Sequence, residues 1–281
     1  MSQRPATTPL DKHVRVNGLR LHYLDYGNAN GQPMLLLHGY GSECHTFDTF
    51  ASHLAGEYHI LSLDFRGFGE SQWSRDGYGH QLMAADVEGF IKALGLKRVV
   101  LMGQSLGGLV AMAYLLQPRP EVEALVIVDI GPDVDPVGYN NFRAYLAALP
   151  DRFASFEEAV AAGVAGRPDR PEALVRRQLQ HNLRQADGGW TWKFDPRLRG
   201  LHATEDWPKL PDLWPALQGL ACPCLVVRGQ RSEYLSASVA EKMQRVTPRC
   251  RLVTLPTGHS VHTEAPEALA LAVRQFLKDA P

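Results

Sequence analysis

Short apolar runs recur along the chain, and glycine-rich or polar turns follow most of them. The four clearest runs are nearly continuous and lie at 33–37, 59–63, 99–102 and 124–128. Continuous runs of this length are typical of parallel strands that are buried on both faces. Helix-favouring stretches separate them, at 46–55, at 78–94 and from Leu109 onward. The alternation of strands with helices predicts an α/β fold with a mostly parallel sheet.

The two ends of the chain extend this sheet. Residues 13–16 and 19–26 flank Asn17-Gly18, and an Asn-Gly pair between such segments predicts an antiparallel hairpin. Near the other end, the pattern predicts strands at 223–227 and 251–255 and helices at 237–246 and 264–278. Eight strands are therefore expected. In parallel sheets, ligands bind at the carboxyl ends of the strands, where the glycine-rich turns lie.

The pattern changes from residue 132 to about 211, where no buried β-run occurs. Helix-favouring pieces lie at 142–149, 156–162 and 171–185. Because this segment is too long for a loop, we expect a helical cap inserted after the sixth strand. The expected division is a core made of residues 1–131 and 214–281 and a cap made of residues 132–213.

The cap carries several aromatic residues, and two interpretations of them stay open. They are Tyr139, Phe142, Trp190, Trp192 and Phe194. They could roof an apolar pocket, or they could form a small core of the cap itself. We favour the second interpretation for the tryptophans.

Composition narrows the class of protein. The chain has 281 residues and a formal net charge of −1, which gives no reason to expect nucleic acid or an anionic membrane as a partner. No apolar run is long enough to span a bilayer, and the N-terminal MSQRPATTPLDKH reads as a short loose tail without the apolar region of a signal peptide. The four cysteines lack metal-ligand spacing. We therefore expect a cytoplasmic protein without a metal, and the sequence carries no signal for an oligomeric state.

The turn after the run at 99–102 holds the clearest chemical motif. Gly103-Gln104-Ser105-Leu106-Gly107 has the form G-x-S-x-G between a strand and a helix, which is the pattern of a nucleophile elbow. By chance alone, a chain of this composition would contain about 0.1 such pentapeptides. The alternative is a glycine-rich turn in which the serine caps the helix. The strand before the motif and the helix after it favour Ser105 as a nucleophile.

A serine nucleophile needs a base, and the base needs an acid to orient it. We predict His259 as the base, because it follows the last strand in Pro256-Thr257-Gly258-His259. His262, three residues on, is interpreted as local support. For the acid we favour Asp129, at the end of the run 124–128, over the runner-up Glu233, which follows the strand at 223–227. Asp129 could instead serve only the turn before Gly131.

An oxyanion would need two hydrogen-bond donors. We expect the backbone N–H groups of Leu106, after the serine, and of Tyr40, in the turn His38-Gly39-Tyr40-Gly41. His38, Gly39 and Gln104 are candidate substrate contacts beside them. The alternative for the 38–41 segment is a simple tight turn.

Four motifs together resemble the α/β-hydrolase superfamily, and small bacterial cytosolic carboxylesterases in particular. They are HGYGS at 38–42, DFRGFGES at 64–71, GQSLGG at 103–108 and GHSVHTEAPEAL at 258–269. The resemblance implies the α/β-hydrolase fold and a structural role for Asp64, Arg66 and Ser71. Haloalkane dehalogenases and epoxide hydrolases carry an aspartate at the elbow, so Ser105 argues against both. Many members place the acid where this chain has Ser232, and others place it where Asp129 stands.

The sequence therefore predicts a serine hydrolase that cleaves a small ester, thioester or lactone through an acyl-enzyme on Ser105, with no cofactor. Two alternatives stay open. A C–C bond hydrolase of a ring-cleavage product would need a cap residue that binds a carboxylate, such as Arg143, Arg176 or Arg177. A ligand-binding receptor on a hydrolase scaffold would keep the same residues without turnover.

Overall fold

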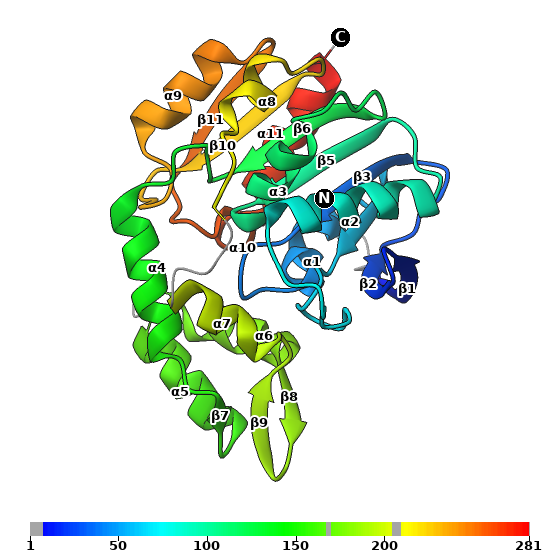
Figure 1. The fold of residues 1–281 in the computed structure, drawn as a ribbon. Coiled ribbons are helices and arrows are strands. Elements are labelled where there is room, and N and C mark those ends of the chain that lie inside the picture. The colour runs from blue at the N-terminus through cyan, green and yellow to red at the C-terminus, as the bar shows by residue number, and fades with distance from the viewer. Residues whose placement is uncertain (1–7, 167–169, 204–208, 281) are drawn as a thin grey trace.

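A twisted sheet of eight strands forms the centre of the molecule (Figure 1). The computed structural model describes residues 8–166, 170–203 and 209–280. In spatial order the strands are β1 (Leu10–Val16), β2 (Leu19–Asp25), β4 (Tyr58–Leu63), β3 (Gln32–Leu37), β5 (Val99–Gln104), β6 (Val122–Val128), β10 (Cys224–Gly229) and β11 (Cys250–Leu255). The pairs β1–β2 and β2–β4 are antiparallel and the other pairs are parallel. The predicted eight-stranded, mostly parallel sheet is confirmed.

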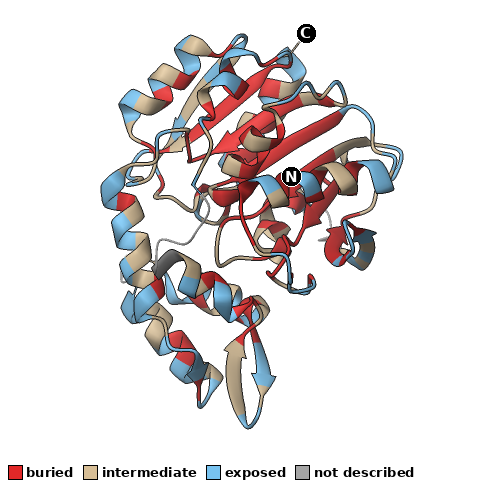
Figure 2. Ribbon diagram, in the orientation of Figure 1, coloured by how far each residue is buried: buried red, intermediate tan, exposed pale blue. Residues whose placement is uncertain are grey.

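Helices cover both faces of this sheet, which explains why its central strands are nearly continuously apolar. One face carries α2 (His80–Ala93), α3 (Leu106–Tyr114), α8 (Trp214–Gln218) and α9 (Ala237–Val246), and the other carries α1 (Asp48–Leu54) and α11 (Pro266–Asp279). Successive residues of a strand point to opposite faces. Leu35 and Leu37 therefore pack on the α2–α3 side, whereas Met34 and Leu36 pack on the α1–α11 side. The central strands are accordingly buried along their length (Figure 2).

The structure corrects the predictions at the two ends of the chain. The expected N-terminal tail is shorter, because β1 already begins at Leu10 and pairs with β2; residues 1–7 lie outside the described part. The helix predicted over 264–278 is divided into α10 (Val261–Glu264) and α11. Pro266 is the cause, because a proline disfavours the helical conformation of the residue before it.

Most of the segment between β6 and β10 forms a second lobe, which we call the cap (Figure 1). It contains α4 (Pro136–Ala148), α5 (Phe156–Gly166), α6 (Glu172–Asn182) and α7 (Pro196–Ala203). Asp135 caps the start of α4 by accepting a hydrogen bond from the N–H of Val137. None of the helices in the described ranges has the length and apolar character needed to cross a membrane.

The cap was expected to be helical, but it also contains short strands. A small antiparallel sheet contains β7 (Arg152–Phe153), β9 (Gly189–Trp192) and β8 (Leu183–Ala186), in that spatial order. Asp187 and Gly188 join β8 to β9 with φ values of 46° and 76°, the left-handed conformations that a two-residue hairpin turn requires. The predicted helix over 171–185 therefore ends at Asn182. The Asp-Gly pair was the signal for this hairpin.

The aromatic residues of the cap divide between the two interpretations. Trp192 and Phe194 are buried and stack with ring centroids 5.3 Å apart, and Phe153 packs edge-on against Trp192. These residues form a core of the cap. Tyr139 and Phe142, on α4, line the cavity described below.

Candidate active site

Ser105 lies in a strained turn between β5 and α3. Its φ of 53° and ψ of −119° are unusual for a residue with a side chain, and such strain is concentrated at functional sites. The turn needs its glycines because the chain is crowded there. A methyl group at Gly103 would overlap the backbone of Gly107, and one at Gly107 would overlap the Leu37 carbonyl. Ser105 is half-buried and lines a cavity, so its hydroxyl is available there.

Asp129 and His259 meet at the ends of β6 and β11. The Nδ1 of His259 lies 2.8 Å from Oδ2 of Asp129, and the other carboxylate oxygen accepts a hydrogen bond of 2.7 Å from the N–H of Gly229. Asp129 is completely buried, whereas the His259 side chain is 22% exposed and lines the same cavity as Ser105. The carboxylate therefore orients the imidazole and holds a proton on Nδ1, which leaves Nε2 as an acceptor.

The loops after β10 and β11 hold His259 in place. Gly229 permits their close approach, since a methyl group there would overlap the carbonyl of Gly258. Tyr234, in the loop after β10, stacks on the His259 ring with centroids 3.9 Å apart. Sequence reasoning missed Tyr234, and the only available signal was an aromatic residue beside the candidate acid Glu233.

Glu233 belongs to the same loop as Tyr234, but its side chain makes different contacts. Its side chain is exposed and accepts a hydrogen bond of 3.0 Å from Asn141 on α4. A methyl group at Gly138 would overlap the carbonyl of Glu233, so α4 and this loop are in close contact. Glu233 therefore connects the core to the cap, and it is Asp129 that contacts the imidazole.

The prediction that His38 contacts substrate is wrong. The side chain is completely buried, does not line the cavity, and has both ring nitrogens engaged: Nε2 lies 3.1 Å from the N–H of Phe65 and Nδ1 lies 2.7 Å from the Gly39 carbonyl. Because Nε2 accepts, Nδ1 carries the proton and donates it to Gly39. Burial lowers the pKa of His38, which keeps the ring neutral.

His38 and Ser42 together orient the peptide that follows Gly39. The N–H of Ser42 donates at 3.3 Å to the Gly39 carbonyl oxygen, which is the same oxygen that accepts from His38. In a trans peptide the C=O and the N–H point in opposite directions. The N–H of Tyr40 is therefore directed away from the bonded side. Gly39 and Tyr40 line the cavity, as do Gln104 and Leu106.

Leu106 begins α3, so its N–H belongs to the first turn, whose donors have no acceptor within the helix. Gln104 points toward the imidazole: its Nε2 lies 3.3 Å from both Nε2 and the carbonyl oxygen of His259. A methyl group at Gly39 would overlap the Gln104 side chain, which shows how tightly the 38–41 turn packs against the elbow.

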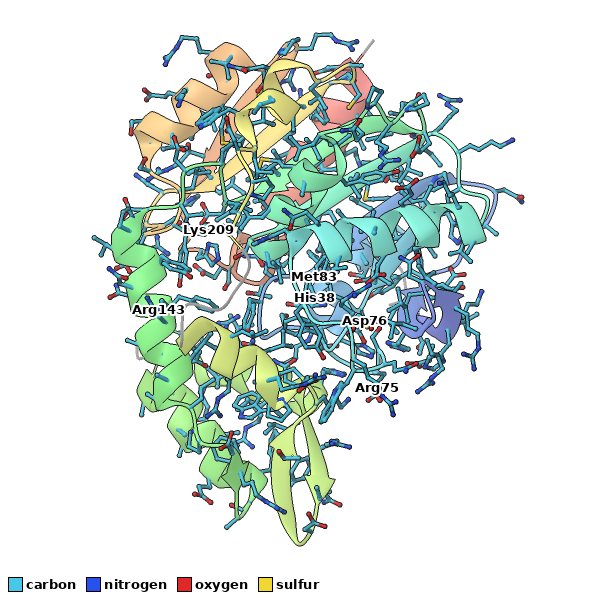
Figure 3. The ribbon with its side chains drawn as sticks, viewed as in Figure 1. His38, Arg75, Asp76, Met83, Arg143 and Lys209 are labelled. Atoms are coloured by element: carbon cyan, nitrogen blue, oxygen red, sulfur yellow. The ribbon has the colours of Figure 1, made fainter. Side chains whose placement is uncertain are left out.

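The cavity has a volume of about 630 Å³ and lies between the core and the cap. Its apolar lining includes Leu109, Ile130, Val134 and Phe142, and its charged lining includes Arg143, Arg170 and Lys209. Figure 3 labels Arg143 on α4 and Lys209 on the chain that returns from the cap. Of the three arginines considered as carboxylate ligands, only Arg143 lines the cavity. Arg176 pairs with Glu157 and Glu172, and Arg177 with Asp48 and Thr49.

His262 lies beside the proposed base and contributes to the cavity wall. Its Nε2 lies 2.9 Å from the hydroxyl of Thr46. Burial, with a smaller contribution from the positive charge of Arg170, lowers the pKa of His262 to about 3. The ring is therefore neutral at physiological pH and acts as local support.

The 64–71 segment is held by buried hydrogen bonds. Asp64 accepts from Nδ1 of His22 and from the N–H groups of Cys44 and Glu70, and Arg66 forms a two-pronged ion pair with Asp86. The hydroxyl of Ser71 donates to the Asp64 carbonyl. These contacts agree with a structural role for this loop.

Two groups of side chains in the described ranges bring possible metal-ligand atoms together. They are His22, Cys44 and Asp64, and Glu43, His45 and His181. Neither group lines the cavity. The first group is already a hydrogen-bonded network, and in the second the two imidazole rings stack with centroids 4.1 Å apart.

Comparison with known proteins agrees with this architecture. A family model described as "Alpha/beta hydrolase family" matches residues 34–273. The chain is 30% identical over 274 residues to the 3-hydroxybutyrate-oligomer hydrolase of Cupriavidus necator, an alignment that covers 92% of each chain. It is 29% identical over 278 residues to Esterase Rv0045c of Mycobacterium tuberculosis, covering 96% of this chain and 90% of the relative. A crystal structure of an alpha/beta hydrolase from Novosphingobium aromaticivorans superposes with a TM-score of 0.82 at 28% identity, covering 96% of this chain and 98% of that one.

Proposed function

The chain belongs to the alpha/beta hydrolase family and is a hydrolase acting on ester bonds, and we propose that it cleaves a small carboxylic ester, thioester or lactone through an acyl-enzyme on Ser105. One observation carries the proposal. The buried Asp129 binds Nδ1 of His259, and that imidazole shares a cavity with a serine in a strained elbow. A serine nucleophile requires a base that a carboxylate orients in this way, which supports the proposal.

In the first step, Nε2 of His259 accepts the hydroxyl proton of Ser105 while the serine oxygen attacks the substrate carbonyl. Asp129 stabilises the imidazolium that forms, because its Oδ2 already accepts from Nδ1. The Gln104 amide, 3.3 Å from Nε2 at rest, gives way to the serine hydroxyl in this step. The imidazolium then donates its proton to the leaving alcohol, and the acyl group stays on Ser105.

The negative charge on the carbonyl oxygen needs donors that are already in place. We assign this role to the N–H groups of Tyr40 and Leu106. The His38 and Ser42 bonds to the Gly39 carbonyl support the first donor, and the start of α3 supports the second. In the second half of the reaction, water attacks the acyl-enzyme with His259 as the base. The acid product leaves and Ser105 regains its proton.

The surroundings of the site support three lesser proposals. Residues 132–213 act as a cap over a core of 1–131 and 214–281, because α4 supplies Tyr139 and Phe142 to the cavity wall. A cytoplasmic location is supported by four cysteines that are all free thiols. The substrate is a small molecule, in keeping with a cavity of about 630 Å³.

The test is turnover of p-nitrophenyl acetate and p-nitrophenyl butyrate by the purified protein. Ser105→Ala should lower kcat/KM by more than about a thousandfold and abolish labelling by a fluorophosphonate probe. Ser238→Ala, a change on the exposed side of α9, is the matched control and should retain both. Turnover that survives in Ser105→Ala would exclude the proposed nucleophile.

A further inference from the structure

We propose that Glu43, His45 and His181 form a binding site for a divalent transition-metal ion of the zinc type, between the core and the cap. Each residue brings one possible ligand atom, and these atoms all lie within 4.8 Å of one another. None of the three residues lines the cavity that holds Ser105 and His259. The site is therefore separate from the candidate active site, and it does not depend on the proposed reaction.

Two imidazoles and one carboxylate form a ligand set that suits zinc. Histidine, histidine and glutamate are a known combination in zinc sites with three protein ligands, where water takes the fourth position. Magnesium and calcium prefer oxygen ligands throughout. Because imidazole suits zinc and its neighbours in the first transition series, the set selects these ions over magnesium and calcium.

A carboxylate behind His45 prepares its ring for a metal ion. The Nδ1 of His45 lies 3.2 Å from Oδ2 of Asp48. An ionised carboxylate only accepts hydrogen bonds, so Nδ1 carries the proton and Nε2 keeps the lone pair that binds a metal. Asp48 is itself held by a hydrogen bond of 2.6 Å from the hydroxyl of Tyr26. A histidine that donates its other ring N–H to a carboxylate is the usual arrangement around a bound metal.

His181 approaches the same place from the cap. It lies in the last turn of α6, and its ring stacks on that of His45 with centroids 4.1 Å apart. The next residue, Asn182, fixes this end of the helix on the core by donating to the Gly41 carbonyl at 2.9 Å. Burial, together with the neighbouring His45, lowers the pKa of His181 to about 4. The ring is therefore neutral at physiological pH and can donate a lone pair.

Glu43 is a buried carboxyl group that gains from a nearby cation. It is 3% exposed, and its Oε2 accepts from the N–H of His45 at 2.8 Å. Burial, together with the negative charge of Asp64, raises the pKa of Glu43 well above its usual range. Lys193 acts in the opposite direction, but its amine pairs with Glu70. A bound metal ion would neutralise the carboxylate, and the proton that it displaces would pass to water.

The side chains need only a small movement to close around an ion. Zinc lies about 2.0–2.2 Å from nitrogen and oxygen ligands, so the ligand atoms of a tetrahedral site are about 3.4 Å apart. Rotation of the two imidazoles brings the atoms to this spacing and tilts the rings out of their stack, so that the ion lies in the plane of each ring. Both histidines are partly exposed, which gives the ion a path from solvent. The bound ion would join α6 to η1 (Cys44–Phe47), the short helix that follows Glu43 in the core.

Calorimetry with zinc chloride, on tag-free protein treated with EDTA and dialysed, tests the site. For the wild type we expect one zinc ion per chain with a Kd of about 10 µM or lower, weaker than structural sites with four ligands. Magnesium chloride should give no binding. His181→Gln and Glu43→Gln should each raise the Kd for zinc at least about tenfold, because even the loss of a residue behind a ligand costs that much.

His53→Gln is the matched control. It removes a partly exposed histidine of α1 that lies outside the three-residue group, and it should leave the Kd for zinc unchanged. Absence of zinc binding to the wild type, or an unchanged Kd in His181→Gln, would overturn the proposal.

Two further measurements distinguish this site from other places for the ion. His259→Asn keeps the three ligands and should bind zinc with the wild-type Kd; a weaker affinity would place the ion in the cavity and overturn the proposal. Titration with cobalt(II) chloride should give a visible spectrum of nitrogen and oxygen ligands that is lost in His181→Gln. A sulfur-to-cobalt charge-transfer band would instead assign the ion to Cys44 and overturn the ligand set.

Thermal unfolding tests whether the ion joins the two lobes. At a hundredfold excess of zinc over the Kd, the Tm of the wild type should rise by about 5 °C, and that of His181→Gln by less than about 1 °C. The Tm of each variant without zinc shows whether it is folded. An equal rise in the two proteins would show that the stabilising ion binds without His181, which contradicts the site.

Discussion

The two ends of the cavity are built in different ways. At the core end, backbone geometry sets the position of each reacting group: Ser105 has a strained φ, Asp129 is completely buried with φ of 55°, and glycines allow the chains to touch. At the cap end, long side chains such as Arg143 and Lys209 line the space. The comparison indicates that the type of reaction depends on the rigid end and the choice of substrate on the adaptable one. Substitutions at the core should therefore lower activity for every ester, and substitutions at the cap should change selectivity.

The largest expected effect concerns the core acid. Asp129→Asn should lower kcat by about ten-thousandfold, because an amide no longer holds the required proton on Nδ1 of His259. Glu233→Gln, in the loop that contacts the cap, should change kcat less than about twofold, because its side chain is exposed and pairs with Asn141. Steady-state kinetics with p-nitrophenyl butyrate measures both. The reverse order of effects would reassign the acid to Glu233.

Two glycines, one in the core and one in the cap, allow the stability of the two lobes to be compared directly. Gly107→Ala should lower the free energy of unfolding by about 3 kcal/mol, because the added methyl group overlaps the Leu37 backbone. Gly200→Ala, in the cap helix α7, adds a methyl group that meets no atom of the described residues within 4 Å, and it should raise that free energy by about 0.5–1 kcal/mol, because alanine favours a helix. Urea denaturation monitored by circular dichroism gives both values. Similar values for the two variants would show that the elbow is not rigid.

The role of His38 can be distinguished from that of a substrate contact. His38→Ala removes the bond that orients the peptide between Gly39 and Tyr40. We expect kcat to fall by roughly tenfold to a hundredfold with KM little changed, because the donor acts on the transition state. The loss should be equal for p-nitrophenyl acetate and p-nitrophenyl butyrate. A selective rise in KM for one ester would instead indicate direct contact with substrate.

The dependence of stability on pH compares buried histidines of the two lobes. Burial lowers the pKa of His262 to about 3 and that of His80 to about 4. Because the unfolded chain binds protons below a pKa of about 6.5, the free energy of unfolding should fall as the pH drops from about 6.5 to about 4, by up to about 1.4 kcal/mol per pH unit for each histidine.

His262→Gln should reduce the slope of the unfolding free energy against pH by the contribution of one histidine. Urea denaturation across that pH range measures this slope. The cap offers a comparison in His181, whose pKa is also lowered to about 4 but whose ring is half-buried. His181→Gln should flatten the slope less, because solvent screens the half-buried group. An unchanged slope in His262→Gln would contradict a neutral, buried ring in the folded state.

The sequence by itself determined the features that depend on neighbours along the chain. Nearly continuous apolar runs predicted the sheet, because its central strands are buried on both faces. The G-x-S-x-G pentapeptide predicted the strand–turn–helix around Ser105, because only small residues fit that turn. The Asp187-Gly188 turn was an equally local signal, but it was not used, and residues 183–185 of the strand before it were assigned to a helix. Periodicity and turn chemistry act over a few residues, so they can be read from the sequence alone.

Only the tertiary structure decided which distant groups meet. Asp129 and Glu233 both follow strands at the same edge of the sheet, and the contact between Asp129 and His259 joins residues 130 positions apart. The burial of His38 and the stacking of Tyr234 on His259 depend likewise on how separate loops pack. Arg143, Arg176 and Arg177 look alike in sequence, yet only Arg143 lines the cavity. The physical reason is that side-chain direction and long-range contact follow from the packing of whole elements, which no local pattern encodes.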